Sequence, residues 1–422
     1  MADKQIDKYL PKLRFPEFKD KGEWETYTLE ELFEIRNGYT PSKSNPSFWE
    51  GGTIPWFRME DIRLNGHILS DSIQHITPAA VKGTGLFPAY SIIVATTATI
   101  GEHALIIADS LANQQFTFLT KRKSHDKQID MMYFHQYMFI IDEWCKKNTN
   151  SSGLLSVNMP AFKQLLIPLP SIKEQKAISS LLSSLDECIA SSKTKLEQLQ
   201  AYKKGLMQKL FPAPGKSLPE YRFPEFINDI SWDSKTLGDV TRIVNKRNKS
   251  NRSLPIYSIN NKRGFVMQSE QFAGIESKSR GYDTSAYKIV TSNLFAYNPA
   301  RINVGSIGYS GSIKEGLISS LYVCFKTTNS VDDGFLKCFI DSYPFQKAVE
   351  NNVEGGIRSY LFYDNFSRIH ISIPSIEEQR KVASAIASFN QLEELYSKKL
   401  SMLEKQKKGL VQVLFPKIDN KI

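Results

Sequence analysis

The strongest constraint on this 422-residue chain is an internal repeat. The segment PKLRFPEF at residues 11–18 returns as PEYRFPEF at residues 219–226, an offset of 208 residues. The same offset aligns Trp24 with Trp232. A recurrence of this kind predicts two copies of one structural unit in a single chain.

A second match shows where the two copies are alike. Residues 167–212 align with residues 371–416 at an offset of 204, with 19 identities in 46 positions. The segments between the matches, residues 38–160 and 246–364, differ in sequence. The repeated unit is therefore similar at its ends and divergent in its middle.

Each C-terminal match predicts a long helix. Ser171 and Ser375 follow a proline and precede Glu174 and Glu378 by three residues, which is the pattern of a capping box. Seam positions then recur at alternating spacings of four and three, and eight of the ten in each copy are apolar, which is typical of a coiled coil. A Phe-Pro pair ends each helix. The apolar seam residues are Ile178, Leu182, Leu185, Ile189, Leu196, Leu199, Leu206 and Leu210 in the first copy, and Val382, Ile386, Phe389, Tyr396, Leu400, Leu403, Leu410 and Leu414 in the second.

The nearest partner for each seam is the other copy, so we expect the two helices to pair as an antiparallel coiled coil with pseudo-twofold symmetry. Packing of each helix on its own globular domain is the alternative. About 40 residues at a rise of 1.5 Å give a spacer of roughly 60 Å. The polar seam positions Ser192, Lys203, Glu393 and Lys407 either set the register or face a further protein.

The middles predict an α+β protein with two mixed α/β domains. Short apolar runs broken by glycine-bearing turns predict many short strands, and short helices are expected at residues 28–35, 131–145 and 333–350. The expected order is a first domain (1–170), a long helix (171–211), a second domain with its linker 212–222 (212–374), a second long helix (375–415) and a tail (416–422).

The second middle contains a basic stretch. Between Val240 and Ser269 there is no acidic residue, whereas cations and amides are frequent. Cations bind phosphate oxygens and amides can read base edges, so this composition favours DNA binding; a solvated loop with chance positive bias is the alternative. The candidate DNA-binding residues here are Asn245, Lys246, Arg247, Lys249, Arg252, Asn261, Lys262 and Arg263.

The first middle is less basic. Aromatic residues accompany its cations, and for Trp56 a place in the core is the favoured interpretation. The candidate DNA-binding residues of the first middle are Arg36, Asn37, Tyr39, Lys43, Arg58 and Arg63.

Composition adds weaker limits. The net charge of +10 fits a polyanionic partner, although many soluble proteins are equally basic. The four widely spaced cysteines predict reduced core thiols, and no apolar run is long enough to span a membrane, so we expect a cytoplasmic protein. No phosphate-binding loop, amino-methyltransferase tetrapeptide or paired-histidine metal motif is found, which disfavours an enzyme and predicts no metal site.

These features together resemble the specificity subunits of type I restriction–modification systems. The resemblance is carried by the domain–helix–domain–helix order and by IPLPSIKEQ (167–175) and ISIPSIEEQ (371–379), which open the helices. It also includes NGYTPS (37–42), Trp49 to Trp56 with Asp61 and Ile62, and SLYVCF (320–325). It covers essentially the whole chain.

The resemblance implies a non-enzymatic subunit whose two target recognition domains each read one half of a split, asymmetric site in double-stranded DNA. It implies that the helices separate the domains and dock two methyltransferase subunits. S-adenosylmethionine would be bound by those subunits, not by this chain, and a motor-nuclease subunit would join for cleavage. An atypical DNA methyltransferase or nuclease, and a structural coiled-coil adaptor without DNA binding, are the alternatives.

Overall fold

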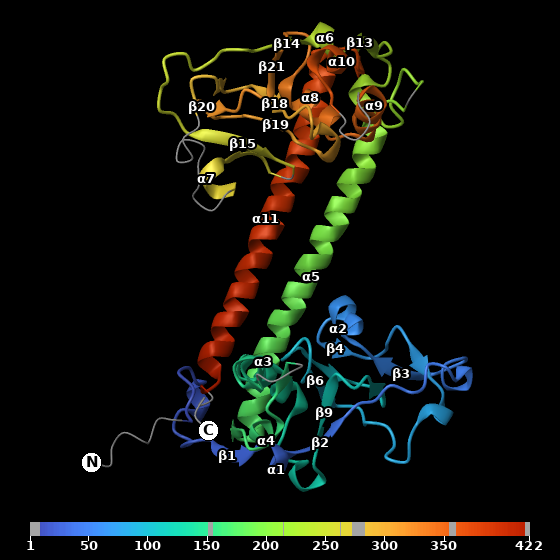
Figure 1. Cartoon of the computed structure of the whole chain (residues 1–422), viewed down its shortest axis with the longest axis vertical. Helices are drawn as coiled ribbons and strands as arrows, with labels where there is room; N and C mark the ends of the chain where they lie inside the picture. Colours follow the sequence, from blue (N-terminus) through green and yellow to red (C-terminus); the bar gives the residue numbers. More distant parts are fainter. Residues whose placement is uncertain are drawn as a thin grey trace. The chain divides into compact units, whose positions relative to one another are not determined.

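The computed structural model describes residues 9–150, 155–213, 215–261, 263–271, 283–353 and 360–417. The chain divides into two compact units, Met1–Lys193 with Lys399–Ile422, and Thr194–Lys398. Each unit combines one globular domain with part of both long helices (Figure 1). The compact units therefore divide within the two helices, not at the points where the helices begin.

The first unit is built on two sheets. The larger has the strand order β2-β9-β6-β7-β4 and the smaller β5-β3-β8, and a further pair joins β1 to β12. The strands are β1 (Glu25–Thr28), β2 (Phe33–Asn37), β3 (Ile54–Phe57), β4 (Ile68–Leu69), β5 (His75–Ile76), β6 (Ser91–Ala95), β7 (His103–Ile106), β8 (Leu111–Ala112), β9 (Phe116–Lys121), β10 (Thr149–Asn150), β11 (Ser156–Val157) and β12 (Leu166–Leu169). The helices are α1 (Leu29–Leu32), α2 (Met59–Asn65), α3 (Met131–Lys147), α4 (Met159–Lys163) and the start of α5 (Ile172–Leu210).

The second unit repeats this plan. Its sheets have the orders β14-β21-β18-β19 and β16-β15-β20-β17, and β13 pairs with β22. The strands are β13 (Asp233–Thr236), β14 (Thr241–Ile243), β15 (Ile256–Asn260), β16 (Gly264–Met267), β17 (Lys288–Thr291), β18 (Phe295–Tyr297), β19 (Ile307–Tyr309), β20 (Glu315–Ile318), β21 (Val323–Thr327) and β22 (His370–Ile373). The helices are α6 (Leu237–Val240), α7 (Gln268–Gln271), α8 (Asp333–Ile340), α9 (Tyr343–Asn352), α10 (Tyr363–Ser367) and α11 (Ile376–Leu414).

The divergent middles share most of their strand order, although the two sheets have five and three strands in the first unit and four each in the second. The order β2-β9-β6-β7 corresponds to β14-β21-β18-β19. In the smaller sheets β3 pairs parallel with β8 and antiparallel with β5, just as β15 pairs parallel with β20 and antiparallel with β16. The predicted α+β class with two mixed domains and two long helices is confirmed.

Two expected helices differ from the structure. The helix predicted at residues 28–35 ends at Leu32, because Phe33 and Ile35 pair with Lys121 and Leu119 of β9 instead. The helix predicted at residues 333–350 is divided into α8 and α9, and Pro344 lies in the first turn of α9, where no intrahelical N–H bond is needed.

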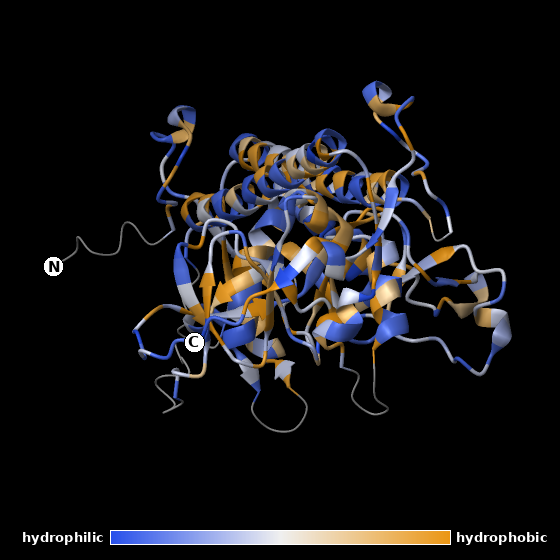
Figure 2. Cartoon of the chain, turned by 90° about the horizontal axis from the view of Figure 1, so that it is seen from above, coloured by the Kyte–Doolittle hydropathy of each residue, from blue (hydrophilic) through white to orange (hydrophobic). Residues whose placement is uncertain are grey.

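The core of each unit joins its domain to the long helices. In the first unit Ile178 and Leu182 of α5 and Leu414 of α11 belong to one buried cluster with α3. In the second, Met207 and Leu210 of α5 pack with Trp232 and with α8. In Figure 2 the helical ribbons carry both hydrophilic and hydrophobic colours, as expected for helices with one buried face. The prediction of core thiols is wrong for one cysteine, because Cys188 is exposed on α5 whereas Cys145, Cys324 and Cys338 are buried.

The two long helices pair with each other in both units. In the first unit Lys407 of α11 contacts Asp186 of α5, with 2.7 Å between Nζ and Oδ1. In the second unit Lys203 of α5 contacts Glu393 of α11, also at 2.7 Å. In the first unit the N-terminal part of α5 contacts the C-terminal part of α11. In the second unit the C-terminal part of α5 contacts the middle of α11, nearer its N-terminus, so the two helices run antiparallel. Two of the polar seam residues are partners of each other.

The repeated motifs form a joint at the start of each long helix. Arg14 of the first RFPEF motif donates to both carboxylate oxygens of Glu174, at 2.7 and 2.8 Å, and Glu174 is buried. Arg222 makes the equivalent pair with Glu378 at 2.9 and 2.8 Å. The residues that recur in sequence are therefore those that fix the domain to its helix.

A buried glutamine completes each joint. The Gln175 side chain donates to the carbonyls of Gln128 and Pro170 and accepts from the backbone N–H of Asp130. Gln379 repeats these contacts with Ser330, Pro374 and Asp332. In both glutamine side chains the NH2 group and the oxygen are hydrogen-bonded to backbone groups. These bonds fix the position of Asp130 before α3 and of Asp332 before α8.

A buried histidine cluster lies beneath α3 in the first unit. His103 contacts Asp142 at 2.9 Å, and the His135 ring lies 5.4 Å from the His103 ring. Burial lowers the pKa of His103 to about 3 and raises that of Asp142 to about 8, so the pair keeps one proton near neutral pH. Burial also lowers the pKa of His135 well below its usual 6.5.

We expect His135 to make the protein less stable in acid. Below pH 6.5 the unfolded chain protonates this histidine whereas the folded chain does not, so folded-state stability is full above pH 6.5 and falls as the pH drops. Between about pH 4 and 6.5 the His103–Asp142 pair holds one proton in both the folded and the unfolded chain. In that range the pair therefore adds no pH dependence to the stability. Lowering the pH from 7.5 to 5.5 should therefore destabilise the wild type by about 1.4 kcal/mol more than it destabilises His135→Leu, because the His103–Asp142 pair contributes equally to both proteins. Denaturant unfolding at both pH values measures this, and His135→Leu should remove it; an equal loss in the variant would contradict the assignment.

Candidate nucleic-acid interface

One edge of the larger sheet in the first unit collects polar side chains. Strand β2 ends at Asn37, β6 ends at Ala95 and β9 begins at Phe116, and because β9 is antiparallel to both neighbours these ends meet. Asn37 is exposed there, and its Oδ1 accepts a hydrogen bond of 2.8 Å from Thr117. The Thr117 hydroxyl is buried and contacts Thr96 at 2.9 Å, so Asn37 is held on a rigid support.

Arg36 and Tyr39, which flank this edge, are engaged within the protein. Arg36 is half-buried, forms an ion pair with Glu34 at 2.9 Å and lies 4.5 Å above the Phe87 ring. The Tyr39 hydroxyl donates to the Ala80 carbonyl and accepts from the Lys82 backbone. These contacts position the loop around Lys82 and leave the Tyr39 hydroxyl without a free donor.

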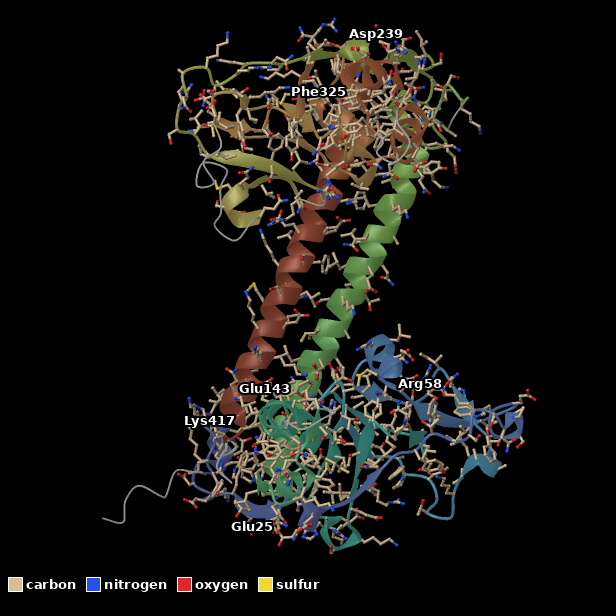
Figure 3. The ribbon with its side chains drawn as sticks, in the orientation of Figure 1. Glu25, Arg58, Glu143, Asp239, Phe325 and Lys417 are labelled. Carbon is tan, nitrogen blue, oxygen red and sulfur yellow. The ribbon has the colours of Figure 1, made fainter. Side chains whose placement is uncertain are left out.

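The other candidates of the first unit have different surroundings. Arg58 precedes α2 (Figure 3), and its backbone N–H donates to the buried Asp61 carboxylate at 2.6 Å. Its guanidinium forms a half-exposed ion pair with Glu60 at 3.1 Å. Lys43 and Arg63 are exposed. Trp56 is buried and donates to the Tyr39 carbonyl, so its place in the core, which the sequence favoured, is confirmed.

The basic stretch of the second unit forms an ordered loop between β14 and β15. Asn248 is buried, accepts from the Arg252 backbone N–H at 2.9 Å and donates to the Arg252 carbonyl at 3.0 Å. The Lys246 carbonyl accepts from the backbone of β17. These bonds hold the loop backbone while the side chains of Asn245, Lys246, Arg247 and Lys249 are exposed.

Arg252 differs from its neighbours because it has an acidic partner. Its guanidinium donates to both carboxylate oxygens of Glu315, which comes from β20. The hydrogen bond to Arg252 lowers the pKa of Glu315, so the pair stays ionised. Lys246, Arg247 and Lys249 form no salt bridge within the described ranges, so these three are the available cations of the loop.

The remaining candidates lie at the β15–β16 turn. Asn261 and Arg263 are exposed, and the Arg263 backbone N–H donates to the Asn260 side chain at 3.1 Å. Lys262 lies outside the described residues.

The shared topology aligns the candidates of the two units. Asn245 follows β14 as Asn37 ends β2, and the two positions are 208 residues apart, the offset of the repeat. The structure thus brings Asn37 and Asn245 to equivalent edges, although the surrounding sequences differ. It does not gather Lys43, Arg58 and Arg63 into one cluster with Asn37 by any contact among the described residues.

The structure adds residues that the sequence did not single out. Gln114 and Gln115 precede β9 at the same edge as Asn37. Exposed Arg301 and Asn303 follow β18 at the equivalent edge of the second unit. The cluster of amides in NQQ (113–115) next to an apolar run is a signal that could have indicated the first pair.

The apolar seam residues near the ends of the long helices pack into the cores of the globular domains, with Ile178, Leu182 and Leu414 in the first unit and Leu210, Val382 and Ile386 in the second. Each apolar seam position of α5 and α11 is buried or half-buried, whereas adjacent positions such as Leu181, Leu395 and Met402 are exposed. The ring of Tyr202 on α5 also contacts the ring of the seam residue Phe389 in a tilted arrangement, with centroids 5.5 Å apart. Among the described helices none is long and apolar enough to cross a membrane.

Comparison with known proteins finds one matching domain and several named relatives. A type I restriction modification DNA specificity domain matches residues 21–201. The EcoprrI specificity subunit of Escherichia coli is 51% identical over 162 residues, a match that spans 38% of this chain and 39% of that protein. The MjaIX specificity subunit of Methanocaldococcus jannaschii is 25% identical over 83% of each chain.

A solved structure shares the fold along the whole chain. The S subunit of a type I restriction–modification system from M. genitalium superimposes with a TM-score of 0.61 at 17% identity, covering 97% of this chain and 100% of that one. The domain match and the named relatives are consistent with the sequence repeat, and the structure shows the two repeated units that the repeat predicts. The chain therefore contains a type I restriction modification DNA specificity domain at residues 21–201, and it is similar to named specificity subunits of type I restriction enzymes.

Proposed function

We propose that this chain reads double-stranded DNA at a split, asymmetric site, with one half-site for each globular domain. The observation that carries the proposal is the contrast between the shared joints and the different edges. Both domains share most of their strand order and have the same Arg–Glu–Gln joint, yet Asn37 stands among amides and threonines whereas Asn245 stands beside three exposed cations. Two domains of related fold and unlike chemistry suit two unlike half-sites.

The long helices would serve as the dock for two methyltransferase subunits. Exposed apolar residues beside the seam, such as Leu392, Leu395 and Met402, are suited to a protein partner. S-adenosylmethionine would be bound by those subunits, and restriction motor-nuclease subunits would join the complex for cleavage. This chain would itself be non-catalytic. No group of three or more metal-ligating side chains that could hold an ion is found among the described residues.

Mapping modified bases tests the proposal. The chain is produced with its methyltransferase subunits, and methylated positions in the host DNA are sequenced. We expect methylation at one bipartite, asymmetric sequence, and we expect replacement of Lys246, Arg247 and Lys249 by alanine to reduce its occupancy. Methylation at a symmetric or unsplit site would contradict the two-reader assignment. The purified chain alone, incubated with labelled S-adenosylmethionine and DNA, should transfer no methyl group; transfer would show that it is an enzyme.

A further inference from the structure

The polar edge of the first unit presents amide side chains whose orientation can be deduced. A side-chain amide has an acceptor oxygen on one side and a donor NH2 group on the other. Which of them faces outward depends on which is used by the protein. The amides Asn37, Gln114 and Gln115 lie at this edge, and Asn113 lies beside Gln115.

Gln115 is oriented by a relay that starts at a backbone donor. The Gln115 backbone N–H donates to Asn113 Oδ1 at 3.1 Å, and a backbone N–H can bond only to the oxygen of that amide. Asn113 Nδ2 therefore faces Gln115 and donates to Gln115 Oε1 at 3.3 Å. The carbonyl of Gln115 is thereby used, and Nε2 remains as an outward donor with no partner in the part of the chain that the structure describes.

The two neighbouring amides have the same orientation. Asn37 Oδ1 accepts from Thr117, and Gln114 Oε1 accepts from Thr40. Asn37 and Gln114 are exposed and Gln115 is half-exposed, so all three can reach a ligand with their NH2 groups. The edge therefore turns its amide NH2 donors outward and its amide oxygens toward the protein.

We propose that this edge, composed of Asn37, Gln114 and Gln115, reads hydrogen-bond acceptors on purine bases in the major groove. The inference rests on the proposed function and gives the chemistry of one half-site. Guanine presents two acceptors, N7 and O6, whereas adenine presents N7 beside a donor. An edge that turns amide donors outward favours guanine, and it disfavours cytosine, which presents a donor there.

The donors of this edge could instead bind phosphate oxygens, which are also acceptors, and the experiment separates the two. The complex of the chain with its methyltransferase subunits is titrated with duplexes that carry the mapped site. Guanines of each half-site are replaced one at a time by 7-deazaguanine, which lacks N7 and leaves the phosphates unchanged. Wild-type protein, Gln115→Ala, Gln115→Glu and Gln128→Ala are compared; Gln128 is an exposed control in the first unit, outside this edge and outside the long helices.

We expect 7-deazaguanine at one or more positions of a single half-site to weaken wild-type binding by about tenfold. Gln115→Ala should weaken binding to the unmodified duplex and lose this sensitivity, and Gln115→Glu should weaken binding further because a carboxylate only accepts. Gln128→Ala should behave as wild type, because it keeps the backbone carbonyl that Gln175 uses.

Two results would overturn the inference. The first is wild-type binding that is indifferent to every 7-deaza substitution. The second is a Gln115→Ala defect of equal size on unrelated sequences, which would indicate a phosphate contact. A complex that binds no DNA, or a site without two parts, would instead count against the proposed function.

Discussion

Replacing Arg14 by alanine should lower the free energy of unfolding of the first unit by about 3–5 kcal/mol. The Arg14 and Glu174 side chains are only 10% and 1% exposed, and they form two parallel hydrogen bonds. Removing the guanidinium leaves a buried carboxylate with no compensating charge, and this uncompensated charge is the main cost. Arg222→Ala should have an effect of the same size in the second unit, where the exposures are 9% and 1%. Denaturant unfolding of the full chain measures both.

The double variant Arg14→Met/Glu174→Met separates charge from packing. Because it removes both members of the pair, it should recover most of the stability that Arg14→Ala loses. Lys146→Ala is the matched control, since its pair with Glu143 is on the surface, with side chains 52% and 65% exposed, and should contribute less than about 1 kcal/mol. Equal losses in Arg14→Ala and Lys146→Ala would show that the joint does not depend on the buried pair.

The parts of the fold that sequence could predict are those encoded by local periodicity. Apolar residues recur every three or four positions from Ile178 to Leu210 along α5. Ser171 precedes this helix, and its hydroxyl accepts a hydrogen bond of 3.4 Å from the Glu174 backbone N–H. The α1–β2 boundary was predicted wrongly because the Thr28–Glu31 capping box is local, whereas the pairing of Phe33 with Lys121 is not. A strong start signal gave no information on where the helix ends.

The candidate site was harder to predict because its contacts also join residues that are far apart in the sequence. Arg252 lies in a stretch without acids, yet Glu315 meets it from 63 residues away in sequence. The orientation of Gln115 depends on Asn113, two residues away, but its place beside Asn37 depends on the sheet. Composition could therefore indicate a basic loop, but it could not show which of its cations are neutralised.

Replacing Lys246, Arg247 and Lys249 together by alanine should weaken DNA binding of the assembled complex by roughly a hundredfold at about 0.15 M salt. These three side chains are exposed on a loop whose backbone is fixed by Asn248, so their removal should leave the fold intact. Each phosphate contact adds about 0.9 to the dependence of log K on log salt, so the slope should fall by about 2.7 if all three bind phosphates. Titrations at several salt concentrations measure both quantities.

Arg252→Ala supplies the contrast for this prediction. Since Arg252 is already neutralised by Glu315, its loss should reduce the salt slope by less than one contact, about 0.9. An effect of Arg252→Ala as large as that of the triple variant would mean that the Glu315 pair opens on DNA and that the loop works as a whole. If the triple variant keeps the wild-type salt slope, the loop does not contact the phosphates. Recognition of the second half-site must then depend on the neighbouring edge, where the cationic side chain of Arg301 and the amide of Asn303 are exposed after β18.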